Sequence, residues 1–254
     1  MNKTARNIII RVSMLIGLTG FVVLAVLAKR NRELSEIKNI HISIDEWSGN
    51  FFVTKDQVSA IIDDKFVVKN RILSGRDLER IEQSLRVIPQ VLHSNAYTDN
   101  AGNLNIKIEQ RKPVLRVYNL QGESYYIDED GVKFPTVNHF AAKVPVVTGF
   151  ITEKYTVPRK AGSTELKRVI KIQQEAGKND LWKELIGQYN INEKKQTELI
   201  PRIGSAVVLF GDDKDAESKF RRLEVFYFEV LRKVGWDYYK VINIMYKDQA
   251  VCLK

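Results

Sequence analysis

The first feature of the hydrophobic pattern is an apolar stretch near the amino-terminal end. Val12 to Ala28 holds no charged residue, and Ile8–Ile10 extend the stretch to 21 positions with Arg11 inside it. A helix of about 20 apolar residues crosses a bilayer core. Arg11 lies near one end, where its side chain can reach the headgroups. The pattern predicts a membrane span from Ile8 to Ala28, and its length favours an uncleaved anchor over a signal peptide.

The next stretch, residues 37–110, changes from strand to helix and back to strand. Ile40, Ile42 and Ile44 alternate with polar residues, as in a strand with one buried face. Two helical patterns follow, and two alternating segments then flank a polar turn with a glycine. The expected elements are a strand at 40–44, helices opening at Thr54 and Ser74, and strands at 91–98 and 104–108. This order predicts two helices on one face of a three-stranded sheet.

The remaining residues, 111–254, predict a larger and more strand-rich part. Short alternating segments are separated by turns such as the one before Gly131, and helices are expected from Ser163 and along 220–234. The last two expected strands cover 241–246 and 250–253. The chain is therefore expected to be α+β, with the strands dominating its second part.

The charge distribution argues against a nucleic-acid-binding protein. The net charge is +9, but residues 1–32 hold six basic side chains and no acid. The other residues carry 34 basic and 31 acidic side chains. The excess therefore flanks the apolar stretch, as at the ends of membrane spans, and leaves no strongly basic surface for nucleic acid.

The sequence offers little catalytic chemistry. The histidines are isolated, Cys252 is the single cysteine, and no P-loop, dinucleotide fingerprint or nucleophile elbow is present. Ser35 and Lys38 match the S-x-x-K spacing of serine acyl-transferases, but Ser35 lies beside the apolar stretch and no K-T-G strand accompanies it. The sequence predicts a non-enzymatic protein without metal, cofactor or small-molecule substrate.

Six segments, in their order and spacing, carry a family resemblance. They are Leu78–Val91, Glu109–Val114 with its E/Q-R-x-P-V/I signature, Tyr126–Pro135, Val144–Gly149, Val207–Leu223 and Tyr239–Tyr246. Together they resemble the FtsQ/DivIB cell-division proteins over residues 1–254. Two positions depart from the family pattern, because Asn243 replaces the usual Asp and Met245 the usual Arg.

The resemblance implies an architecture. It consists of a cytoplasmic tail at 1–7, a single transmembrane helix at 8–28, a juxtamembrane linker at 29–36, a βααββ POTRA domain at 37–110, and a mixed β-rich domain at 111–254 with a C-terminal helix and an edge strand. It also implies a single-pass inner-membrane protein at the division septum, with its amino terminus in the cytoplasm and its folded domains in the periplasm.

The function that the resemblance implies is a scaffold, which bridges early and late division proteins to control septal peptidoglycan synthesis. Its expected partners are the small coiled-coil proteins FtsB and FtsL, and indirectly FtsW and FtsI. Family members bind FtsB largely by strand addition at the end of the β domain. The matching residues here are Tyr246, Asp248, Ala250, Cys252 and Leu253.

The hydrogen-bonding groups of a terminal strand agree with the expected strand addition. A terminal strand tends to lie at a sheet edge, where it offers unpaired backbone N–H and C=O groups. The alternative is that Val251 and Leu253 merely close the sheet. A POTRA-type periplasmic chaperone or secretion factor could use the same strand addition, but that class usually carries repeated modules.

Overall fold

The structure, a computed structural model, describes residues 14–24, 26, 36–45 and 51–254. Among them, residues 36–45 and 53–110 form one compact unit, and residues 51–52 and 111–254 form a second. The mixture of helices with a large sheet confirms the α+β class. The turn expected at Trp47–Asn50 lies outside the described residues.

The described part of the apolar stretch, residues 14–24, is helical. Its large apolar side chains are exposed, among them Met14 and Phe21. Within the described residues, no helix combines the length and the apolar character that a membrane crossing requires. The rest of the expected span from Ile8 to Ala28 lies outside the described residues, apart from residue 26.

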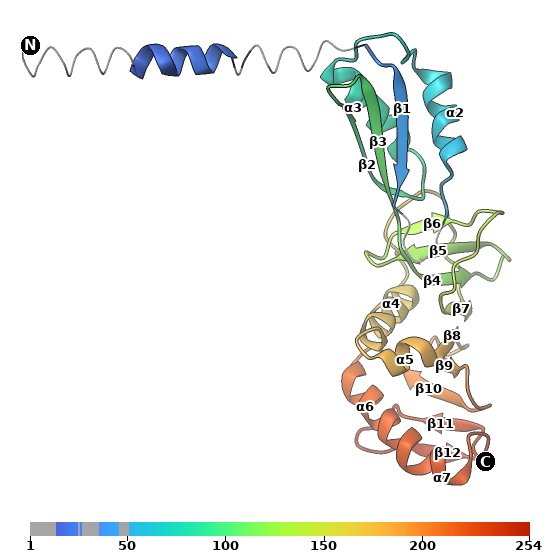
Figure 1. Ribbon diagram of the computed structural model, residues 1–254. Coiled ribbons are helices and arrows are strands. Elements are labelled where there is room, and N and C mark those ends of the chain that lie inside the picture. The colour runs from blue at the N-terminus through green and yellow to red at the C-terminus, as the bar shows by residue number, and fades with distance from the viewer. Residues whose placement is uncertain (1–13, 25, 27–35, 46–50) are drawn as a thin grey trace, which may run out of the picture. The chain divides into compact units, whose positions relative to one another are not determined.

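The first unit has the element order that the sequence predicts for 37–110. Strand β3 is central, pairs with β1 in parallel and with β2 antiparallel, and gives the sheet order β1-β3-β2. Helices α2 and α3 contact β1 and β2, respectively. The elements are β1 (Asn39–Ile44), α2 (Lys55–Lys65), α3 (Gly75–Arg86), β2 (Val91–Thr98) and β3 (Asn103–Gln110) (Figure 1).

Local signals set the helix boundaries of this unit. Thr54 accepts a hydrogen bond from the amide of Gln57 and caps α2. The complete reciprocal capping box forms at α3, where Ser74 and Asp77 each accept from the other's amide. The helix faces and the sheet then enclose one core, formed by Val58, Ile62, Ile81, Leu85, Leu104, Ile106 and Ile108.

The second unit alternates strands and helices along the chain. Helix α4 begins after Ser163, as the sequence predicts, stops at Gly177 and is followed by α5. The elements are β4 (Pro113–Tyr118), β5 (Ser124–Asp128), β6 (Lys133–Pro135), β7 (Val146–Gly149), α4 (Thr164–Ala176), α5 (Asp180–Leu185), β8 (Ile186–Ile191), β9 (Thr197–Pro201), β10 (Val207–Gly211), α6 (Ala216–Phe226), the π-helical turn η1 (Tyr227–Leu231), α7 (Arg232–Val234), β11 (Val241–Asn243) and β12 (Val251–Leu253).

These strands form one nine-stranded sheet with the order β12-β11-β10-β9-β8-β7-β4-β5-β6. Parallel pairing joins β4 to β7, β7 to β8 and β10 to β11, and the other neighbours are antiparallel. Helices α4, α5 and α6 share a single core with the strands, so they cover one face of the sheet (Figure 1). The large residues at its centre include Trp182, Tyr189 and Phe210.

An aromatic cluster lies on the other side of β5. Phe52 contacts Tyr126, Phe134 and Phe140 edge-on, with ring centroids 5.0–5.4 Å apart. Tyr126 and Phe134 stack on each other. Such edge-to-face pairs contribute about 0.5–1.5 kcal/mol each beyond area burial. Phe52 thus anchors residues 51–52 on the second unit, to which these two residues belong.

The structure differs from the sequence-based expectation near the end of the chain. The strand predicted over 241–246 ends at Asn243. The side chain of Asn243 accepts a hydrogen bond from the amide of Met245, which turns the chain locally and competes with the sheet ladder.

Candidate functional site

The carboxyl-terminal strand β12 lies at one end of the nine-stranded sheet. It pairs antiparallel with β11, so that Val241, Ile242 and Asn243 face Leu253, Cys252 and Val251. Among the described strands, none lies on the other side of β12. An edge of this kind presents backbone N–H and C=O groups that another strand can pair with.

The two faces of β12 have different surroundings. Val251 and Leu253 are 43% and 61% exposed and share one face with Asn243 and Val241. Cys252 lies on the other face, opposite the fully buried Ile242, and packs against the core. Burial raises the pKa of the Cys252 thiol. The exposed apolar pair therefore belongs to the open face of the sheet.

The five residues expected to bind a partner divide into two groups. Tyr246 and Leu253 are each more than half exposed, and Asp248 is exposed in the turn before β12 with a left-handed φ of 59°. Ala250 and Cys252 are half-buried and contact the core. The edge position brings all five to one end of the sheet, and their role in binding stays a prediction.

The sequence-based selection leaves out Val251. Val251 is exposed on the same face as Leu253. The two-residue period of a strand places residues 251 and 253 on one face, so this period identifies Val251 from the sequence. Arg222 is also missing from the residues selected from the sequence. It is a polar residue on an amphipathic helix, and the helical pattern does not show that its side chain contacts a turn far away in the sequence.

Arg222 connects helix α6 to the segment between β11 and β12. Its Nη2 donates to the carbonyl oxygens of Ile244 at 3.0 Å and of Tyr246 at 3.2 Å. Its Nε is buried without a hydrogen-bond partner among the described residues. The guanidinium therefore fixes the start of the turn that leads into β12.

Exposed aromatic side chains flank the start of β11. Trp236 and Tyr238 lie between α7 and β11, and the ammonium of Lys254 sits 4.6 Å from the Tyr238 ring centroid. The hydrogen bond with Tyr238 raises the pKa of Lys254. Large aromatic residues dominate binding energy in protein interfaces, whereas isolated lysines contribute less. The elements next to the edge strand therefore supply suitable anchor residues.

The acidic turn after β5 serves the fold. The carboxylate of Asp128 accepts hydrogen bonds from the amides of Asp130 and Val132 and pairs with Arg111 at 2.7 Å. Gly131 has the positive φ, 78°, that the turn pattern predicts. The residues that the structure describes contain no group of His, Cys, Asp and Glu suited to a metal ion. Ser35 of the S-x-x-K pair lies outside the described residues.

A comparison with protein families identifies the family to which the second unit is similar. A family model described as FtsQ/DivIB, C-terminal related, matches residues 112–253, which include every strand from β4 to β12. The search of curated proteins finds no match. The matched region contains the edge strand, the turn before it and Arg222.

Proposed function

Because the chain belongs to the FtsQ/DivIB C-terminal related family, a family of non-enzymatic cell-division proteins, we propose that it is a scaffold of the bacterial divisome. It binds FtsB and FtsL through the β12 edge and so connects early division proteins to the septal synthase FtsW and its transpeptidase FtsI. The observation that carries this proposal is the position of β12, which, among the strands that the structure describes, pairs with β11 alone.

The binding mode is addition of a partner strand along β12. Backbone hydrogen bonds supply affinity, and side chains on alternate positions supply specificity. Val251 and Leu253 contact the partner's side chains on the open face, and Tyr246 and Asp248 contact it before the strand begins. Ala250 and Cys252 keep β12 in place, since both pack against the core.

The chain is anchored in the inner membrane by residues 8–28, with residues 1–7 in the cytoplasm. Residues 29–36 form the linker, and residues 37–110 and 111–254 are a POTRA domain and a β domain in the periplasm at the septum. Exposed apolar side chains along the described helical residues support the anchor. Thr19 supports it too, because its hydroxyl donates to the carbonyl oxygens of Leu15 and Ile16 and is satisfied within the helix. The element order β-α-α-β-β supports the POTRA assignment.

The test is co-purification of the full chain, in detergent, with the FtsB- and FtsL-like proteins of the same cell. Leu253→Lys places a charge on the open face of β12, where it opposes strand addition. Tyr246→Glu replaces the exposed aromatic side chain before the turn that leads into β12 with a charged one. Leu120→Lys is the matched control, because Leu120 is an exposed leucine in the turn between β4 and β5.

We expect Leu253→Lys and Tyr246→Glu each to reduce the retained partner about tenfold, since each removes more than about 1.4 kcal/mol of binding free energy. Leu120→Lys should retain the partner at the wild-type level. Full retention by both edge variants would place the binding site elsewhere. No retention by the wild-type chain would contradict the scaffold proposal itself.

A further inference from the structure

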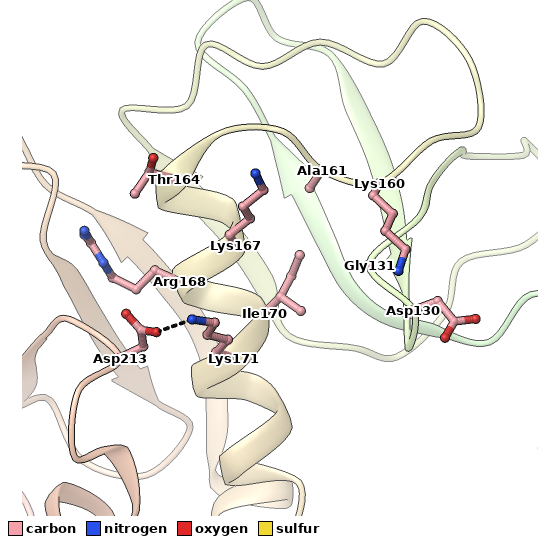
Figure 2. A pocket seen from close by; sticks show the side chains of 10 residues that line it. All are labelled: Asp130, Gly131, Lys160, Ala161, Thr164, Lys167, Arg168, Ile170, Lys171 and Asp213. Carbon is pink, nitrogen blue, oxygen red and sulfur yellow. Dashed lines mark hydrogen bonds and ion pairs between the residues drawn. The ribbon is translucent and has the colours of Figure 1, made fainter.

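The second unit has a basic groove on the side that its helices cover. The residues of this groove are far in the sequence from the edge strand β12. The groove runs between α4 and the turn that joins β5 to β6 and has a volume of about 400 Å³. Its lining contains none of the five edge residues. Figure 2 shows Lys167, Arg168, Ile170 and Lys171 on the helix, and Asp130 and Gly131 on the turn.

Four cationic side chains and two carboxylates line this groove. Lys171 pairs with Asp213 at 2.9 Å, and Arg168 donates to the carbonyl oxygen of Lys195. Lys160 and Lys167 are exposed, and no carboxylate of the described residues lies within ion-pairing distance of either ammonium. With four cations and two carboxylates, the groove lining keeps a positive excess, and Lys160 and Lys167 are its cations without an ion pair among the described residues.

The floor of the groove is apolar. Ala161 and Ile170 are buried there, and the Cδ1 of Ile170 lies 3.6 Å from where a Cβ on Gly131 would stand. The backbone amides that precede α4 are occupied, because the carboxylate of Glu153 accepts from Gly162 and Ser163. The amides of Gly162 and Ser163 are therefore not open to a phosphate, which would also leave the apolar floor unfilled.

The positive surface continues beyond the groove. Arg168 also lines a neighbouring hollow of about 390 Å³, whose other basic residues are Lys194, Lys195 and Lys219. The Nζ of Lys219 is engaged by Asp212, but Lys194 is exposed. Two adjoining basic hollows fit an extended ligand better than a single small anion.

We propose that this groove, which we call the α4 groove, is a second docking surface that binds an acidic amphipathic segment of a partner protein. Apolar side chains of the segment rest on Ile170 and Ala161, and its carboxylates pair with Lys160 and Lys167. The proposal is independent of strand addition at β12, since the two surfaces share no residue.

The test measures fluorescence anisotropy of a fluorescein-labelled helical peptide of Glu and Leu, with leucines every three to four positions. The full chain in detergent is titrated into it at low and at high salt. The double variant Lys160→Glu with Lys167→Glu reverses the two cations. The matched control is Lys69→Glu with Lys183→Glu, which reverses two exposed lysines outside the groove.

We expect the groove variant to raise the Kd about tenfold and the control to change it less than about twofold. Wild-type binding should weaken with salt and fall for a peptide of the same composition with scrambled leucine positions. Equal binding by the groove variant overturns the proposal, and so does an absence of binding to the wild type. Polyphosphate or anionic lipid vesicles could bind more tightly than the peptide and lose this binding in the groove variant. That result would contradict the proposal that the ligand is a peptide segment. The Leu253→Lys variant should bind the peptide normally, which separates this proposal from the one for β12.

Discussion

The guanidinium of Arg222 donates a hydrogen bond to the backbone carbonyl oxygen of Tyr246 across 3.2 Å. The same Nη2 also donates to the carbonyl oxygen of Ile244. Helix α6 therefore holds the segment that enters the edge strand, although the two residues lie 24 positions apart in the sequence. The shape of the candidate binding edge depends on a helix that need not contact the partner.

Replacing Arg222 with Gln should loosen the turn and β12 without unfolding the second unit. Hydrogen bonds to charged groups contribute about 1.5–3 kcal/mol, so we expect amide exchange in residues 245–253 to accelerate at least about tenfold. Mass-spectrometric hydrogen exchange measures this. Arg221→Gln is the control, because Arg221 pairs with Glu217 and both side chains are mostly exposed. Equal exchange in the two variants would mean that Arg222 does not support the edge.

Lys133 is completely buried and should be costly to truncate. Its Nζ lies 2.7 Å from the carboxylate of Glu153 and 2.7 Å from the carbonyl oxygen of Lys154. Lys133→Ala leaves the carboxylate unpaired, so we expect the free energy of unfolding to fall by about 3–5 kcal/mol in urea denaturation. The double variant Lys133→Met with Glu153→Gln should recover part of this loss.

Lys154→Ala is the control for that comparison, because the hydrogen bond uses the backbone of Lys154 and its side chain is exposed. We expect a change below about 0.5 kcal/mol. If Lys133→Ala behaved like Lys154→Ala, the pair would contribute nothing to stability.

Glu153 should make the second unit sensitive to acid. Burial raises the pKa of its carboxyl group, but hydrogen bonds from Lys133 and from the amides of Gly162 and Ser163 outweigh burial and hold the pKa at about 2. The folded-state pKa is therefore below the unfolded value of 4.5. The stabilisation is complete above pH 4.5 and is lost as the pH falls toward 2.

Denaturant midpoints measured across this pH range check the expectation. Glu153→Gln should lower stability at neutral pH and flatten its dependence on pH in the acid range. Glu229→Gln, at an exposed carboxylate that pairs with Lys233, should leave the slope unchanged. A Glu153→Gln curve parallel to the wild-type curve would contradict the assignment.

Gly149 lies where β7 ends, and a side chain there should be poorly tolerated. Its φ is +95°, and an added Cβ would stand 2.1 Å from the carbonyl oxygen of Ile191. Gly122 has a similar φ of +80° but open space around it. We expect Gly122→Ala to cost about 1–2 kcal/mol through backbone strain, and Gly149→Ala to cost at least twice as much. Thermal unfolding would measure both, and equal losses would mean that the contact with Ile191 relaxes.

Much of the fold could be predicted because its signals are local. The capping residues Thr54, Ser74 and Ser163 mark helix starts, and alternation along 91–110 defines a hairpin, as observed. The location of the last strand at a sheet edge also follows from chain order. Strand β11 ends early because of a side-chain hydrogen bond within the turn, which hydrophobic periodicity does not encode.

Long-range partners could not be predicted in the same way. Lys133 lies between apolar residues as a single charge, a pattern that usually means exposure, and its partner Glu153 is 20 positions away. Phe52 packs on Tyr126 and Phe134, although the sequence pattern around Phe52 predicts only a connecting segment. At the candidate site, the division between exposed Leu253 and packed Cys252 depends on the register with β11.

The order of the strands along the chain determines when the β12 edge becomes available. Strand β12 is the last of the nine to be synthesised, and its neighbour β11 reaches β10 only after α6, η1 and α7 intervene. Parallel pairing across such a connection requires loop closure before the hydrogen bonds between β10 and β11 form. A chain in which β11 and β12 have not yet joined the sheet lacks this edge, so recruitment through β12 would select for molecules whose second unit has folded.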